Sequence, residues 1–193
     1  MFRQIRVHPD DSDLQRILWR ADPEAEVQDF RLTTVTYGTA SAPYLAIRTL
    51  IQLAQDEGHR HPYGAAVIHK NTYVDDILAG ASTLEEALHV RKQTMELLEA
   101  GGFRLSKWAS SHPQLCLDGD QAERLFTTTE GVGTLGVIWA PAEDSLRIRA
   151  VPRLNSAEKP TKRSVLSDVA RLFDPASWAA PVLVAAKVFL QDL

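Results

Sequence analysis

Residues 72–79 read TYVDDILA, a stretch that places two adjacent aspartates between apolar, β-forming residues. Two interpretations are open. In the first, 72–74 and 77–79 are the arms of a β-hairpin, and Asp75-Asp76 is its solvated two-residue loop. In the second, the same loop holds a metal, because adjacent carboxylates repel unless a cation neutralises them, and Mg²⁺ prefers carboxylate oxygens with positions left open for phosphate. Apolar arms would keep the carboxylates at a rigid edge.

The flanking sequence predicts two helices. Apolar residues recur at helical spacing from Pro43 to Gly58, after a glycine turn. A second helix begins near residue 84 behind a capping box, formed either by Ser82 with Glu85 or by Thr83 with Glu86, and stops at the glycine pair 101–102. The apolar side of this second helix carries Leu84, Ala87, Leu88, Met95 and Leu98.

Strands are expected on both sides of these helices. The segments 2–7 and 15–19 are predicted to form a hairpin around HPDDSD, and 29–36 and 103–110 are predicted to be further strands. The segments 132–140 and 145–151 are predicted to form a hairpin around PAED, before a helix at 161–173. The segment 62–70 is ambiguous. The fold class is therefore α+β, with a mostly antiparallel sheet, helices on one face, and a C-terminal helical segment.

Other polar clusters carry weaker signals for a metal. Asp10, Asp11 and Asp13 follow a proline and include a serine, a composition typical of a turn. The six histidines form no ligand pattern, and the lone Cys116 allows neither an internal disulfide nor a cysteine zinc cage. A reducing intracellular compartment, cytoplasmic or nuclear, is the expectation.

The overall composition restricts the partners only in part. A net charge of −4 argues against a surface that grips nucleic acid everywhere, although a local basic groove is compatible with it. No apolar run reaches the roughly 20 residues of a bilayer span, and the opening residues lack a signal-peptide core. The chain opens in a β-like run and stops within an apolar helical pattern, which predicts a piece of a larger protein.

Six segments along the chain resemble one family. The TYVDD stretch resembles the catalytic hairpin of reverse transcriptases. VTYGTASAPYLAIRTL (35–50), LLEAGGFRLSKWAS (97–110) and GTLGVIW (133–139) resemble their nucleotide-proximal turn and helix, palm helix and strand, and primer-gripping strands. FRQIRVHPDDSDLQRILWR (2–20) and TKRSVLSDVARLFDP (161–175) resemble more narrowly the polymerase of Bel/Pao-type retrotransposons.

The resemblance implies an RNA-directed DNA polymerase that adds dNTPs to a primer 3′-hydroxyl with Mg²⁺, or Mn²⁺, as cofactor. Its implied partners are an RNA or DNA template-primer, dNTPs and the rest of a polyprotein, with no membrane. The implied site residues are Asp75 and Asp76 for metal binding and catalysis, Lys107 as proton donor to pyrophosphate, Phe2, Tyr37 and Gly38 at the nucleotide, and Tyr73, Val74, Leu135 and Gly136 at primer and template.

The resemblance also divides the chain and exposes a difficulty. Residues 1–151 would be partial fingers and palm, and 152–193 the start of a thumb or connection region. The family's other metal-binding aspartate would fall before Met1, and Ser177 stands where the family commonly has glycine. A catalytically dead or repurposed nucleic-acid-binding or structural module is therefore the alternative, with an unrelated aspartate-dependent hydrolase third.

Simpler roles stand beside the implied ones. Phe2 is also compatible with a core aromatic, and Lys107 with a solvated surface lysine. Gly38 is compatible with a glycine that only relieves a turn.

Overall fold

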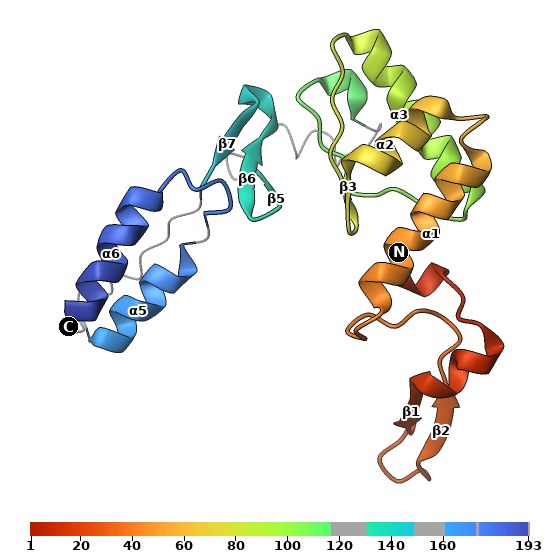
Figure 1. The fold of residues 1–193 in the computed structure, drawn as a ribbon. Helices are drawn as coiled ribbons and strands as arrows, with labels where there is room; N and C mark the ends of the chain where they lie inside the picture. Colours follow the sequence, from red (N-terminus) through yellow and green to blue (C-terminus); the bar gives the residue numbers. More distant parts are fainter. Residues whose placement is uncertain (117–130, 149–160, 173, 193) are drawn as a thin grey trace. The chain divides into compact units, whose positions relative to one another are not determined.

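The computed structural model describes residues 1–116, 131–148, 161–172 and 174–192, and it divides into two compact units, Met1–Lys107 and Trp108–Leu193 (Figure 1). The predicted mixture of helices and antiparallel strands is confirmed. The strands of the described residues form three separate small sheets, however, and not the one sheet that was expected. Each unit is described by itself below.

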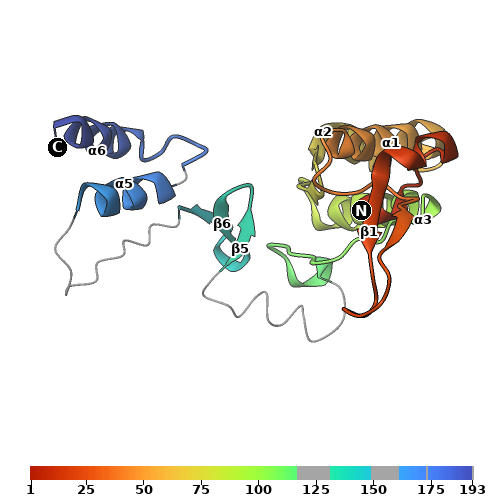
Figure 2. The ribbon, with the colours of Figure 1, turned by 90° about the horizontal axis from the view of Figure 1, so that it is seen from below.

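Three helices form the centre of the first unit. They are α1 (Ala42–Glu57), α2 (Pro62–Asn71) and α3 (Leu84–Ala100), and each contacts the other two (Figure 2). Leu97 of α3 has 0% of its surface exposed, because the other two helices cover it. The core cluster consists of Leu50, Ala54, Ala65, Ile68, Leu97, Leu98 and Phe103.

The segment 62–70, which was ambiguous from the sequence, lies in helix α2. Its small residues allow close packing against α3, and this packing explains why the segment is helical. A Cβ added to Gly64 would lie 2.7 Å from the carbonyl oxygen of Gln93, so only glycine lets α2 approach the backbone of α3 this closely. The backbone N–H of Tyr63 donates to Oε1 of Gln93 at 2.8 Å. The helical state of this segment therefore depends on packing against a helix about 30 residues further along the chain.

The start of α3 shows half of one of the two predicted capping boxes. The Thr83 hydroxyl accepts a hydrogen bond from the Glu86 N–H at 3.2 Å, as the predicted pair requires. The Glu86 carboxylate reaches one residue further back than in the standard motif and accepts from the Ser82 N–H at 3.1 Å. The helix ends at Ala100, before the predicted glycine pair.

The prediction for the first 20 residues is wrong in its strand pairing. Residues Phe2–Gln4 form a 3-10 turn, η1, and only Arg6 bridges to Thr34. Strand β1 (Arg16–Trp19) pairs with β2 (Gln28–Arg31), not with 2–7. Residues 2–7 and β1 do not pair because the segment between them is not the expected tight turn. It is a seven-residue 3-10 segment, η2 (Pro9–Gln15), which carries the chain away before β1 begins.

The predicted strand at 103–110 is also wrong. Residues 103–110 contain no strand, and none of the strands in the described residues pairs with them. Lys107 has a φ of 57°, a left-handed conformation that interrupts an extended run. The segment instead attaches to the helices through Phe103, a core residue, and through Leu105, which packs against the core cluster.

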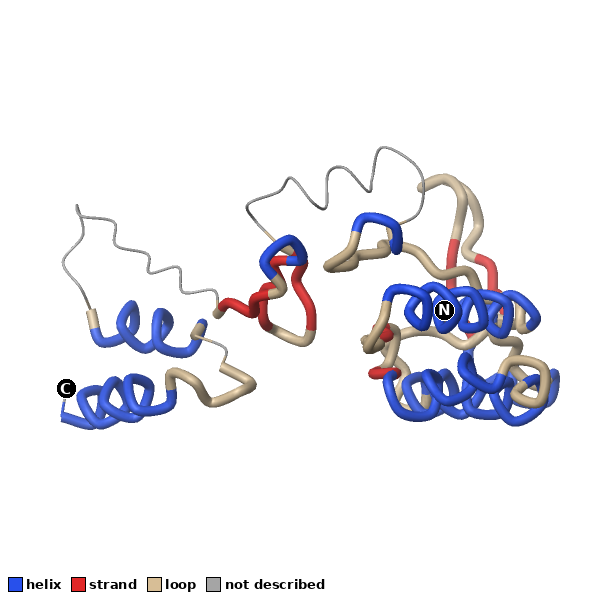
Figure 3. Tube along the Cα trace, turned by 90° about the horizontal axis from the view of Figure 1, so that it is seen from above, coloured by secondary structure: helices blue, strands red, loops and turns tan. Residues whose placement is uncertain are grey.

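The second unit contains a three-stranded antiparallel sheet and two helices. The sheet has the order β5 (Val132–Thr134), β6 (Val137–Ala140), β7 (Ser145–Arg147). The predicted hairpin around PAED is confirmed as β6 and β7, joined by a 3-10 turn, η4 (Pro141–Glu143), and a second 3-10 turn, η3, spans Pro113–Leu115. Helices α5 (Lys162–Arg171) and α6 (Ala180–Asp192) contact each other (Figure 3).

None of the helices in the described part of the chain combines the length and the apolar character of a membrane span.

Candidate functional site

The two aspartates lie on a β-hairpin, but its loop is displaced by one residue from the prediction. Strand β3 (Thr72–Tyr73) pairs with β4 (Asp76–Ile77), so the two-residue loop is Val74-Asp75 and not Asp75-Asp76. Asp75 is therefore a loop residue, and Asp76 belongs to a strand. Both side chains are exposed to solvent.

The backbone of the loop is strained at Val74. Its φ is 56°, whereas a β-branched residue avoids positive φ. Two-residue hairpin loops require positive φ at their first central position, where glycine or asparagine is usual. Holding a valine there costs on the order of 1–3 kcal/mol, which the surrounding structure must supply. Such outliers cluster at functional sites.

The pairing register directs one face of the hairpin to the core and the other to solvent. Thr72 lies opposite Ile77, and both are half-buried, with Ile77 packed against the core cluster. Tyr73 lies opposite Asp76 on the other face, and the Tyr73 side chain is 64% exposed. The apolar arm thus anchors the hairpin, while Tyr73 and both carboxylates face outward.

The base of the hairpin is closed by Asn71, which the sequence interpretation missed. Its side-chain Nδ2 donates to the carbonyl oxygen of Leu78 at 2.8 Å, and its own carbonyl accepts from the Leu78 N–H at 2.9 Å. Because Asn71 is the last residue of α2, these two bonds tie the returning strand directly to a helix. An asparagine between a helical pattern and a β-like run is the signal that could have indicated this.

A shared core connects the hairpin with the segments that carry Phe2 and Lys107. Met1 and Ile5, Ile77, and Leu105 all pack against the same cluster of buried residues. Met1 precedes Phe2, Ile77 follows Asp76, and Leu105 lies two residues before Lys107. The fold therefore places these three predicted sites on segments that share one core.

Tyr37 and Gly38 lie in the turn that precedes α1. Tyr37 is exposed, and Gly38 has a φ of 89° with open space where a Cβ would be. The backbone conformation and not crowding therefore requires this glycine. The same segment reaches the N-terminal residues through the Val35 N–H, which donates to the Ile5 carbonyl at 2.9 Å.

Leu135 and Gly136 belong to the second unit and form the loop between β5 and β6. Both have positive φ, 46° and 87°, as a type I′ hairpin loop requires. This loop usually carries asparagine and glycine, so an apolar, exposed leucine is unusual at its first position. Leu135 and Val74 are thus two apolar residues held in strained hairpin loops.

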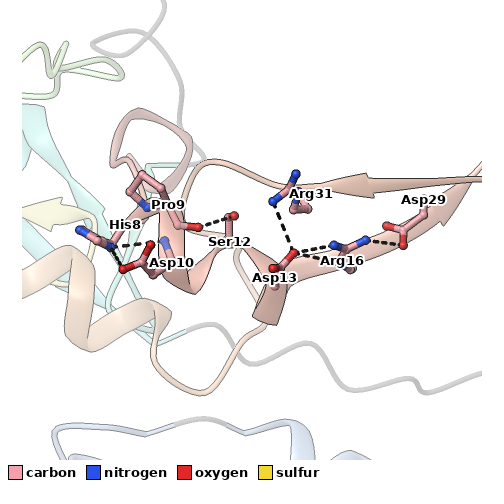
Figure 4. A network of polar contacts seen from close by, with 8 residues as sticks. All are labelled: His8, Pro9, Asp10, Ser12, Asp13, Arg16, Asp29 and Arg31. Carbon is pink, nitrogen blue, oxygen red and sulfur yellow. Dashed lines mark hydrogen bonds and ion pairs between the residues drawn. The ribbon is translucent and has the colours of Figure 1, made fainter.

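In the rival acidic cluster, Asp13 is held by arginines (Figure 4). The Arg16 guanidinium contacts Asp13 Oδ1 at 2.7 Å and Asp29 Oδ2 at 2.6 Å, and Arg31 lies 3.7 Å from Asp13. Hydrogen bonds from Arg16 to Asp29, then to Asp13, raise the pKa of Arg16 above its usual range. Asp13 is therefore engaged by arginines, and Asp10 lies beside His8.

The hairpin carboxylates fit a magnesium ion that has few protein ligands. Among the residues that the structure describes, no three His, Cys, Asp or Glu side chains gather into a metal-binding group. Mg²⁺ commonly uses one or two carboxylates and fills its other positions with water and substrate phosphate. Asp75 and Asp76 supply that number of carboxylates at an exposed edge.

These observations define a mixed helical and antiparallel protein with an exposed, rigidly mounted acidic hairpin. Comparison with known families gives one match: residues 161–193 match the model of the Pao retrotransposon-like RNaseH-like domain. The match covers α5 and α6 and supports a Bel/Pao retrotransposon origin. No curated protein and no solved structure matches the chain.

Proposed function

We propose that this chain is part of the reverse transcriptase of a Bel/Pao-type retrotransposon, in which the acidic hairpin serves RNA-directed DNA polymerisation. The observation that carries the proposal is the Val74-Asp75 loop: a strained valine beside a carboxylate, on a hairpin whose other face is packed on a helical core. The match of residues 161–193 to the Pao retrotransposon-like RNaseH-like domain supports the Bel/Pao part of this proposal.

The geometry suggests distinct roles for the hairpin residues. Asp75, in the loop, would bind the cation directly, and Asp76, in the strand beside it, would contribute less directly. Tyr73 shares its outward face with Asp76 and would pack against the primer end. A bound divalent cation would neutralise the negative charge that develops on the phosphates during transfer.

Residues outside the hairpin would act on the nucleotide and the product. Phe2, Tyr37 and Gly38 would contact the incoming dNTP, and Lys107 would donate a proton to the leaving pyrophosphate. Leu135 and Gly136 would hold the primer strand. Solvent-exposed positions for Tyr37, Lys107 and Leu135 are compatible with these roles.

The test is substitution of Asp75 by Asn. We expect Mn²⁺ binding in the presence of dNTP, followed by electron paramagnetic resonance, to weaken strongly, because the direct carboxylate ligand is lost. Primer extension on a primed RNA template should fall by about 100-fold or more, the scale of removing a group that stabilises transition-state charge. Asp11→Asn, which removes the same charge from the exposed η2 segment, is the matched control and should change neither.

Three outcomes would contradict the proposal. If Asp75→Asn and Asp11→Asn have equal effects, the hairpin is not the metal site. If the chain releases phosphate from dNTPs without any primer, and Asp75→Asn abolishes that release, a hydrolase is the better assignment. Retained nucleic-acid binding without metal-dependent turnover in either protein would favour the repurposed binding module.

A further inference from the structure

We propose that the open edge of strand β2 is a docking site for a second copy of this chain. The two β2 strands would pair antiparallel around a two-fold axis at Phe30, and the two β1–β2 hairpins would become one four-stranded sheet. The backbone register and the charges of β2 point to this contact independently of the acidic hairpin.

The register shows which backbone groups of β2 are free. In the described part of the chain, β2 pairs with β1 alone, with Ile17 opposite Phe30. The Leu32 N–H donates to the Gln15 carbonyl at 3.1 Å, so residues 15 and 32 are a hydrogen-bonded pair. Because such pairs alternate along an antiparallel ladder, Phe30 also faces β1, and Asp29 and Arg31 direct their N–H and C=O groups to the other side.

Just beyond β2, the backbone groups on the side away from β1 are already hydrogen-bonded to the N-terminal residues. The Val7 N–H donates to the Thr33 carbonyl at 3.0 Å, and the Val35 N–H donates to the Ile5 carbonyl at 2.9 Å. The 3-10 segment η2 then carries the chain across to the β1 side. The open edge is therefore limited to residues 28–32, on a hairpin that projects from the helices of its unit (Figure 1).

The charges along this edge match the charges of the same edge on a second copy. In a pairing centred on Phe30, Asp29 lies opposite Arg31 of the second copy, and the reverse pair forms across the axis. Opposite charges directly across an antiparallel pair are stabilising. Arg16 bonds to Oδ2 of Asp29, which leaves Oδ1 for the second copy.

Phe30 itself suits the position on the axis. Residues 30 of the two copies would form a pair without hydrogen bonds, the kind in which side chains come closest, and an aromatic pair there adds stability. The ring is already steadied by Trp19, since the two ring centroids lie 6.1 Å apart in an edge-to-face arrangement.

The open edge of β1 offers no such match. By the same alternation, Arg16 and Leu18 direct their backbone groups outward. A pairing centred on Ile17 would set Arg16 against leucine, and one centred on Leu18 would set Arg16 against Arg20 of the second copy. Like charges directly opposite are destabilising, so charge selects the β2 edge.

The first experiment measures self-association of the full chain by sedimentation velocity over a concentration series. We expect a weak, concentration-dependent dimer, because an edge contact of this size is small. Arg31→Pro removes an outward N–H without touching the β1–β2 ladder and should weaken association roughly tenfold or more. Leu18→Pro makes the same change on the β1 edge and should leave association unchanged. Circular dichroism checks that both variants fold.

The second experiment tests the register by oxidative cross-linking in a Cys116→Ser background. Phe30→Cys should give a disulfide-linked dimer, because the two cysteines would face each other across the axis. Gln28→Cys lies on the same face of the same strand but opposite Leu32 of the second copy, and it should not cross-link. A monomer at every concentration, equal cross-linking of the two variants, or a dimer weakened by Leu18→Pro and not by Arg31→Pro would overturn the proposal.

Discussion

Single residues with left-handed backbone mark the positions where this fold departs from ordinary preferences. In the described residues, the non-glycine positions with positive φ are Val74, Lys107, Leu135, Asp144 and Ser177. Three of these five, Val74, Lys107 and Leu135, are also residues of the predicted site. Strain is tolerated only where the surroundings determine the conformation, which favours function over chance at these loops.

Ser177 gives a direct test of such strain. Its φ is 58°, in the loop where Asp174 accepts hydrogen bonds from the N–H groups of Trp178 and Ala179 at 2.9 and 2.7 Å. Ser177→Gly should raise the free energy of unfolding by about 0.5–1 kcal/mol, because glycine adopts this φ without a steric cost. Chemical denaturation of the full chain provides the measurement.

The matched control for Ser177 is Ser167, inside helix α5. Ser167→Gly should lower the free energy of unfolding by about 0.5–1 kcal/mol, because glycine is the poorer helix former. The same chemical change should therefore have opposite signs at the two positions. Equal signs would contradict the assigned backbone conformation of Ser177.

Asn71 gives a second test at the residue scale. Asn71→Ala should destabilise the hairpin by about 1 kcal/mol, the usual net value of a lost hydrogen bond, and should speed amide exchange at Leu78. Asn71→Asp keeps the size but lacks the donor, so it should behave like alanine. Gln52→Ala removes another exposed side-chain amide and should leave Leu78 exchange unchanged. Full protection of Leu78 in Asn71→Ala would show that the side chain does not hold the base.

At the scale of elements, this chain relies on short hairpins that have little core of their own. An isolated two-stranded hairpin is marginal in water, so each needs an external support. The acidic hairpin uses Ile77 and Asn71, whereas β1–β2 uses the ion pairs of Arg16. The first is therefore fixed by burial, and the second depends on exposed charges that salt screens.

The β6–β7 hairpin makes a pH-dependent prediction. A hydrogen bond from Arg147 to Glu143, at 2.6 Å, lowers the pKa of the Glu143 carboxyl below its usual 4.5. A depressed folded-state pKa contributes stability above pH 4.5, and this contribution is lost as pH falls through the lower folded value. Carbon-detected NMR titration should give a Glu143 midpoint below 4.5, which Arg147→Ala should return toward that value. A midpoint at or above 4.5 in the unsubstituted chain would contradict the ion pair.

At the scale of the whole molecule, the division into two units predicts separable stability. Leu97→Ala removes a fully buried side chain from the core of the first unit and should cost about 2–5 kcal/mol of unfolding free energy there. Hydrogen exchange followed by mass spectrometry should show faster exchange in α1, α2 and α3. Exchange in β5–β7 should stay the same, because every core residue that packs with Leu97 lies in Met1–Lys107. Uniform acceleration across both units would contradict the division.

The hairpin was predictable because its signals are local. The β-forming residues on both sides and the turn preference of Asp75 and Asp76 act within a few residues, and they correctly indicated a hairpin. The loop was misplaced by one residue because the packing of Ile77 on α1, α2 and α3 fixes the register, and no local rule contains that contact. Asn71 was missed for the same reason, since its role appears only when Leu78 returns beside it.

The sequence by itself determined the α+β class, helices α1, α3 and α5, two candidate caps for α3, and the presence of an acidic hairpin; the structure selected Thr83 as the cap. Apolar periodicity, caps and turn residues act over one or two helical turns, so they can be read along the chain. Only the tertiary structure decided that 62–70 is a helix, that β1 pairs with β2, and that 103–110 forms no strand. These outcomes depend on burial and pairing between segments far apart in sequence, where a contact such as Gly64 against Gln93 overrides local preference.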